Sequence, residues 1–104
     1  MNEAVDVRIE ATVGKLHELA PQLKAAGANR LCLFGSRARG DARPDSDLDV
    51  LIDTTARADA PRFDYFKVLH LIEAATSLHA QISQRELLKP RLAERIADDL
   101  IEVF

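Results

Sequence analysis

Apolar positions near the start of the chain recur at helical spacing and predict an amphipathic helix over about residues 3–26. This apolar stripe consists of Val5, Ile9, Val13, Leu16, Leu19 and Leu23. Pro21 has no backbone N–H, so it should kink the helix or divide it in two. Gly27 follows as a typical helix stop and marks the expected end of the segment.

Two further helices are predicted by the same kind of spacing. One covers about residues 61–77 with Pro61 in its first turn. Its apolar residues are Phe63, Phe66, Leu69 and Ile72. The other begins at Pro90, after Ser83 and Glu86, which have the spacing of a capping box for a short turn. Its stripe is spaced by four and comprises Leu88, Leu92, Ile96, Leu100 and Phe104.

Short apolar runs predict the strands. "RLCLFG" indicates a buried strand, "DLDVLID" a second strand from Asp47 to Asp53, and "LHAQIS" a weaker third one. Between the first two strands we expect a turn from Gly35 to Gly40 and a loop over residues 41–46, and "TTARADAP" is expected to be a loop as well. The predicted order is α-β-β-α-β-α, in a single domain over residues 1–104.

The composition narrows the class of protein. The chain has 104 residues, of which 47% are apolar and 30% charged, and this is ordinary for one globular domain. Its formal net charge of -3 argues against a non-specific nucleic-acid coat or a basic membrane-surface protein. Cys32 is the single cysteine, which suits a reducing compartment. With no secretory signal and no long apolar run visible, we expect a cytoplasmic protein that does not span a membrane.

The stretch "LFGSRARGDARPDSDLDVLID" carries two chemical features, and the first is the Gly-Ser turn after the first strand. Gly35 would let a ligand approach the backbone closely, and Ser36 adds a hydroxyl donor. Arg37 and Arg39 add positive charge. The spacing matches neither Gly-x4-Gly-Lys-Ser/Thr nor Gly-x-Gly-x-x-Gly, so a phosphate cradle and an ordinary turn both remain open at this point.

The second feature is the acidic cluster of Asp45, Asp47 and Asp49. Alternate residues of a strand share a face, so Asp47 and Asp49 should point the same way with Cα atoms about 7 Å apart. Two inward carboxylates need neutralisation by Arg or by a divalent cation such as Mg²⁺, which prefers oxygen ligands. An ordinary Asp-rich turn accounts for Asp45 but poorly for Asp49, because Asp is disfavoured within strands.

Together these features closely resemble the signature of the nucleotidyltransferase fold of the DNA polymerase β superfamily: an apolar strand, Gly-Ser, a spacer, then Ser-Asp-x-Asp leading into an apolar strand. The short length and the variant Gly-Ser-Arg-Ala-Arg-Gly resemble the minimal nucleotidyltransferases, and "RELLKPRLAERI" resembles their closing helix. The resemblance implies an α/β fold of the polymerase β type, with a small mixed sheet of three or four strands flanked by helices.

The resemblance also implies roles for individual residues and for partners. Asp47 and Asp49 would be the catalytic acids and the ligands of Mg²⁺ in a two-metal site. The nucleotide-binding residues would be Gly35, Ser36, Arg37, Arg39 and Ser46. ATP would be the substrate, and its AMP would move to a HEPN-type toxin that this chain silences as the antitoxin. No membrane contact and no independent nucleic-acid binding are expected, and a homo-oligomer is compatible with the pattern.

One position departs from the family pattern. The third carboxylate comes from the next strand in this family, and counting back from Pro90 places it at Gln81, whose neutral amide cannot act as a base. The chain is therefore either a nucleotidyltransferase in which another acid substitutes, or a catalytically impaired nucleotide-binding antitoxin that neutralises its partner by complex formation. The acids to consider as substitutes are Asp53, Asp64 and Glu86. Transfer to a small molecule or RNA would require a substrate-binding domain that this length does not hold.

Overall fold

The computed structural model describes residues 2–54 and 61–104, and the predicted loop over 54–61 lies almost entirely outside these ranges. The helices are α1 (Asn2–Glu18), α2 (Ala20–Ala25), α3 (Gly35–Arg39), α4 (Tyr65–Thr76) and α5 (Pro90–Ile96), with short 3-10 turns η1 (Arg85–Leu87) and η2 (Ala97–Asp99). The strands are β1 (Arg30–Phe34), β2 (Leu48–Asp53), β3 (Ala80–Gln84) and β4 (Ile101–Glu102). None of the described helices is both long enough and apolar enough to cross a membrane.

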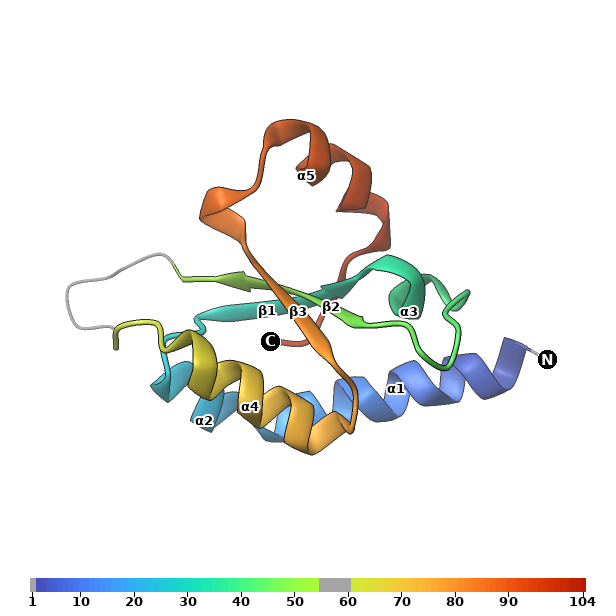
Figure 1. Cartoon of the computed structure of the whole chain (residues 1–104), viewed down its shortest axis with the longest axis horizontal. Helices are drawn as coiled ribbons and strands as arrows, with labels where there is room; N and C mark the ends of the chain where they lie inside the picture. The colour runs from blue at the N-terminus through green and yellow to red at the C-terminus, as the bar shows by residue number, and fades with distance from the viewer. Residues whose placement is uncertain (1, 55–60) are drawn as a thin grey trace.

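The strands form one mixed sheet in the order β3-β2-β1-β4. β1 is antiparallel to both β2 and β4, whereas β2 and β3 run parallel because α4 connects them as a crossover helix. Figure 1 shows α1, α2 and α4 on one side of the sheet and α5 on the other. The predicted small mixed sheet flanked by helices is confirmed.

Side-chain alternation along β2 explains why this strand is buried on both faces. Leu48, Val50 and Ile52 lie in the larger apolar cluster, which α1, α2 and α4 cover. Leu51 points the other way, into a smaller cluster with Cys32 and residues of α5. Because alternate residues share a face, Asp49 lies on the α5 side of the sheet together with Leu51.

Pro21 divides the first predicted helix, as expected. α1 ends at Glu18 and α2 begins at Ala20, with Pro21 in its first turn, where the missing N–H costs no helical hydrogen bond. Gly27 follows α2 with a φ of 94°, which is the left-handed conformation that favours glycine. The chain can therefore turn sharply from α2 into β1.

The helix predicted from Pro61 begins later than expected. Asp64 is its N-cap, since the Asp64 carboxylate accepts a hydrogen bond of 3.2 Å from the Lys67 N–H. Asp64 itself has an extended backbone conformation, and its N–H donates to the Ala26 carbonyl at 2.8 Å. The capping box predicted at Ser83 and Glu86 is also wrong, because η1 has no side-chain cap.

The last helix is much shorter than the apolar stripe up to Phe104 predicts, and that part of the prediction is wrong. α5 ends at Ile96, and the chain then returns to the sheet as β4, because the outer edge of β1 needs a hydrogen-bonding partner. The Val103 N–H donates to the Leu31 carbonyl at 2.9 Å, and the Leu31 N–H donates to the Phe104 carbonyl at 3.1 Å. The spacing by four still reflects burial, since Leu100 packs in the smaller apolar cluster.

Alanine substitutions at Gly27 and Gly14 test the close packing of the chain around Gly27. A Cβ on Gly27 would lie 2.6 Å from the backbone N of Phe63, in a conformation already unfavourable for other residues. We expect Gly27→Ala to lower the free energy of unfolding by about 2 kcal/mol or more. Gly14 lies within α1 and has nothing within 4 Å of such a Cβ, so Gly14→Ala should raise stability by about 0.5–1 kcal/mol. Urea denaturation of both variants measures this, and a Gly27→Ala protein as stable as the wild type would contradict the packing.

Candidate active site

The predicted turn after β1 is the short helix α3, and its first residue contacts the acidic strand. Gly35 has a φ of 79°, and a Cβ placed on it would collide with the Asp49 Oδ2 atom. Gly35 is thus required twice, for its left-handed backbone and for the close approach of the Asp49 carboxylate. α3 ends at Gly40, which is also left-handed with a φ of 87°. The Gly-Ser turn and the acidic strand predicted from the sequence therefore form one site.

Asp47 and Asp49 are both half-buried beside this turn. β2 begins at Leu48, one residue later than predicted, so Asp47 is the last residue of the loop and Asp49 lies within the strand. Burial raises the pKa of the Asp49 carboxyl above its ordinary value of 3.8, the Asp47 charge raises this pKa further, and the Arg39 charge opposes both. The structure therefore holds two acidic groups close enough to repel each other.

Within the described part of the chain, no hydrogen bond or ion pair engages either of these carboxylates. The nearest opposing charge is that of Arg39, whose guanidinium is bonded elsewhere, to Asp99 at 2.9 Å and to Asp41 at 3.2 Å. Asp99 has a side chain only 18% exposed and ties η2 to α3. The carboxylates of Asp47 and Asp49 remain available to a ligand.

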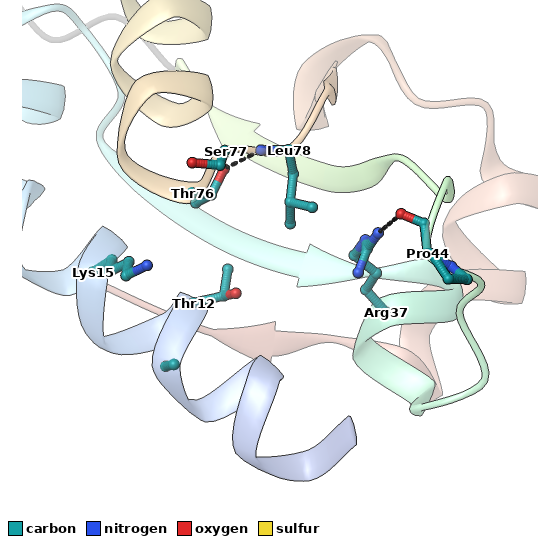
Figure 2. Close-up of a pocket in the computed structure, with 8 residues that line it drawn as sticks. Thr12, Lys15, Arg37, Pro44, Thr76, Ser77 and Leu78 are labelled. Atoms are coloured by element: carbon teal, nitrogen blue, oxygen red, sulfur yellow. Dashed lines mark hydrogen bonds between the residues drawn. The ribbon is translucent and has the colours of Figure 1, made fainter. Parts of the chain in front are cut away.

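Arg37 lies on the other side of α3 and contacts main-chain oxygens. Its Nε and Nη2 atoms donate to the Ser46 carbonyl at 2.9 and 2.8 Å. The Nη2 atom also reaches the Pro44 carbonyl at 3.2 Å and the Arg43 carbonyl at 3.3 Å. Figure 2 shows the side chain of Arg37 directed to the loop at Pro44. No sequence pattern indicates these contacts, because they depend on the folded path of residues 43–46.

Ser46 closes the turn that precedes Asp47. Its hydroxyl accepts a hydrogen bond of 2.9 Å from the Arg43 N–H, and its own N–H donates to the Arg43 carbonyl at 3.0 Å. Asp45 is exposed in the same turn, as its interpretation as a loop residue predicted. Among the described residues, the Ser36 hydroxyl makes no hydrogen bond, so its donor is available beside the two carboxylates.

Gln81 lies next to Asp49 across the sheet. β2 and β3 pair in parallel with Asp49 opposite Gln81, so the two side chains share a face. Gln81 is exposed. The neutral amide therefore occupies the position on the adjacent strand from which a third acid would reach the pair.

The three acids considered as substitutes lie elsewhere. Asp53 is at the opposite end of β2, where it pairs with Arg30 in the strand register. Glu86 accepts hydrogen bonds of 2.6 Å from the N–H and the hydroxyl of Thr54, just beyond that end. Asp64 caps α4. Across residues 2–54 and 61–104, no group of three or more His, Cys, Asp or Glu residues could hold a metal ion, so a substitute acid is not found.

The donor set can be tested for its fit to Mg²⁺. Hard cations take oxygen ligands, and Mg²⁺ commonly binds one or two carboxylates together with substrate phosphates and water. Asp47 and Asp49 supply two such groups, which repel each other without a cation and have no other hydrogen-bonding or ion-pair partner in the described ranges. The residues present therefore fit one Mg²⁺ shared with a phosphate, whereas a second metal lacks a third carboxylate.

A cavity of about 340 Å³ lies beside this site, between α1, the residues Arg37 and Pro44, and the end of α4. It is lined by Ala11, Thr12, Lys15, Arg37, Pro44, Thr76, Ser77 and Leu78, seven of which are labelled in Figure 2. Neither Asp47 nor Asp49 is among these residues. Among the lining residues, Arg37 is the one that comes from α3.

Fold and sequence comparison agree on the class of protein. Residues 15–103 match the family model described as the nucleotidyltransferase domain, and the chain belongs to this family. A crystal structure of a toxin–antitoxin with AMP-PNP has the same fold, with a TM-score of 0.66 and 15% identity over 88% of this chain and 72% of that one. The predicted family and the polymerase β-like fold are confirmed.

Two relatives with similar sequences have names that state a more specific activity than the family description does. The protein adenylyltransferase MntA of Thermococcus cleftensis is 27% identical over 74% of this chain and 76% of its own length. A putative protein adenylyltransferase of Methanocaldococcus jannaschii is also 27% identical, over 70% of this chain and 74% of its own length. The chain therefore belongs to the nucleotidyltransferase family and is similar in sequence to protein adenylyltransferases.

Proposed function

We propose that this protein transfers AMP from ATP to a partner protein and acts as the antitoxin of that partner. The observation that carries the proposal is the pair of half-buried carboxylates of Asp47 and Asp49, of which Asp49 lies against Gly35, and neither has a hydrogen-bonding or ion-pair partner in the described structure. Such a pair suits a divalent cation that is shared with the phosphates of a nucleotide better than any structural role. The names of the relatives supply the acceptor class, since they are protein adenylyltransferases.

The reaction is a displacement at the α-phosphorus of ATP. A hydroxyl oxygen of the partner forms the new bond to the α-phosphorus, the bond between that phosphorus and the bridging oxygen breaks, and pyrophosphate leaves. The hydroxyl proton is lost to solvent or to a base. Gly35 and Ser36 would bind the triphosphate through a close backbone approach and the free Ser36 hydroxyl.

Asp47 and Asp49 would hold Mg²⁺, which when bound supplies positive charge that offsets the charge on the phosphates. Arg39 adds a positive charge close enough to lower the pKa of Asp49. The partner is a HEPN-type toxin in this proposal, because the sequence resembles antitoxins of such modules and a structure of the same fold is a toxin–antitoxin. Partner binding would place the accepting hydroxyl at the open side of the acidic pair.

A second function is favoured by Gln81. In register with Asp49, it puts a neutral amide where the family has a third acid, and the described residues form no group of three or more His, Cys, Asp or Glu that could hold a metal ion. The chain could then bind nucleotide without turning it over and neutralise the partner by contact alone. The site is the same in both proposals, and the difference lies in whether a covalent bond forms.

The discriminating experiment uses ATP labelled at different phosphates. The purified chain is incubated with the protein encoded beside it, Mg²⁺, and ATP labelled at either the α- or the γ-phosphate. AMP transfer predicts that the partner acquires the α-label and not the γ-label. If neither label reaches the partner while the two proteins still form a complex that silences the toxin, the second function is correct.

A further inference from the structure

The Arg37 guanidinium donates its hydrogen bonds to main-chain oxygens of the loop that leads into Asp47. The guanidinium contacts the carbonyls of Arg43, Pro44 and Ser46 at 2.8–3.3 Å. Its two bonds to the Ser46 carbonyl arrive from Nε and Nη2, the planar arrangement that arginine alone among the side chains offers. The Ser46 carbonyl belongs to the peptide group whose nitrogen is that of Asp47.

The helix α3, which carries Arg37, is anchored in the apolar core. α3 begins immediately after Phe34, which is buried in the smaller apolar cluster, and Gly40 ends it. The N–H groups of Gly40 and Asp41 both donate to the Ser36 carbonyl at 3.0 Å. Arg37 therefore ties a helix anchored on the sheet to the part of the loop that the Arg43–Ser46 turn closes.

We infer that Arg37 is a positioning residue, which sets the backbone of Asp47 and thereby aims its carboxylate beside that of Asp49. This inference rests on the proposed function and deepens it. The alternative is a direct contact of Arg37 with the phosphates, which its hydrogen bonds disfavour, because the guanidinium would have to leave three carbonyls. Residues that orient metal ligands typically change metal affinity by about 10–100-fold when they are removed.

Lysine is not a substitute at this position. One ammonium group can donate to the Ser46 carbonyl, but it cannot reproduce a planar fork that spans three carbonyls. Arg43 offers a matched control, since its exposed side chain lies in the same turn and carries the same charge. Only its backbone atoms take part in the contacts with Arg37 and Ser46.

The test compares Arg37→Ala, Arg37→Lys and Arg43→Ala with the wild type. Binding of Mn²⁺ is measured by electron paramagnetic resonance in the presence of a non-hydrolysable ATP analogue, and analogue binding is also measured without metal. We expect Arg37→Ala and Arg37→Lys to weaken Mn²⁺ binding by about tenfold or more. Metal-free analogue binding should be unchanged in both, and Arg43→Ala should resemble the wild type throughout.

Two further readouts separate positioning from general damage to the fold. Hydrogen exchange of the Ser46 and Asp47 amides should be faster in Arg37→Ala than in the wild type, with no metal present. Methylguanidinium can enter the 340 Å³ cavity that Arg37 lines and should restore Mn²⁺ binding to Arg37→Ala.

The outcomes distinguish this inference from the proposed function. Unchanged exchange at Ser46 and Asp47, or unchanged Mn²⁺ affinity in both Arg37 variants, would overturn the positioning role even in an active protein. Loss of metal-free analogue binding on Arg37→Ala would assign Arg37 to the phosphates instead. The wild type could also bind the analogue but no Mn²⁺, while hydrogen exchange is accelerated in Arg37→Ala. This result would show that Arg37 holds the loop before Asp47 in place, and it would overturn the proposed metal site together with the role of Arg37 in aiming a metal ligand.

Discussion

Replacing both Asp47 and Asp49 by Asn is expected to reduce AMP transfer by at least about 10³-fold, because metal-dependent charge stabilisation is worth several kcal/mol in such reactions. Asn keeps the shape of each side chain but removes the negative charges that would hold Mg²⁺. The transfer of α-label to the partner measures this loss. Asp45→Asn is the matched control, since Asp45 is exposed in the turn before the site, and it should retain transfer.

The double Asn variant should also stay folded, which separates a catalytic role from a structural one. Burial and the Asp47 charge raise the pKa of Asp49 above 3.8 in the folded protein, so the folded state binds this proton more tightly than the unfolded chain. The wild type therefore loses stability as the pH rises through the interval between those two pKa values. Asp49→Asn should lack this loss and be at least as stable as the wild type at neutral pH. A variant that unfolds would contradict the account of the site.

Gln81→Asp is expected to increase Mg²⁺-dependent transfer by about tenfold or more, because it places a carboxylate in register with Asp49 on the same face of the sheet. Without Mg²⁺ the same change should lower stability, since a third negative charge then faces Asp49 and Asp47. Initial rates of label transfer over a range of Mg²⁺ concentrations measure the gain, and thermal unfolding measures the cost.

Ser83→Asp provides the control for charge alone. Ser83 is two residues along β3 on the same face, but it lies opposite Leu51 instead of an acid. It should give no increase in transfer. An equal gain from Ser83→Asp, or no gain from Gln81→Asp, would show that the missing third carboxylate does not limit the reaction.

The sequence predicted the central part of the structure well, because the residues there are constrained locally. The apolar runs of β1 and β2 are buried on both faces, and their short length between turn residues favours strands over helices. Gly35 and Asp49 were both identified as site residues, and the collision that a Cβ at Gly35 would cause with Asp49 shows that they contact each other. The placement of Gln81 by counting from Pro90 agrees with the strand register.

What the sequence could not predict depends on contacts between distant segments. The stripe after Pro90 is compatible with a helix, but Ile101 and Glu102 form β4 because the edge of β1 lies open beside them. The pairing of Arg39 with Asp99 follows from that same return of the chain. The contacts of Arg37 with loop carbonyls involve no side-chain pattern at all, so no spacing in the sequence could indicate them.

In the proposed function, α3 and the acidic residues at the start of β2 form one nucleotide site that needs a divalent cation. Calorimetric titration of ATP into the purified chain, with and without Mg²⁺, tests it most directly, using Asp47→Asn/Asp49→Asn as the comparison. We expect Mg²⁺ to strengthen ATP binding to the wild type and to have no such effect on the double variant. Binding that ignores Mg²⁺ in the wild type, or an equal effect of Mg²⁺ on both proteins, would contradict it.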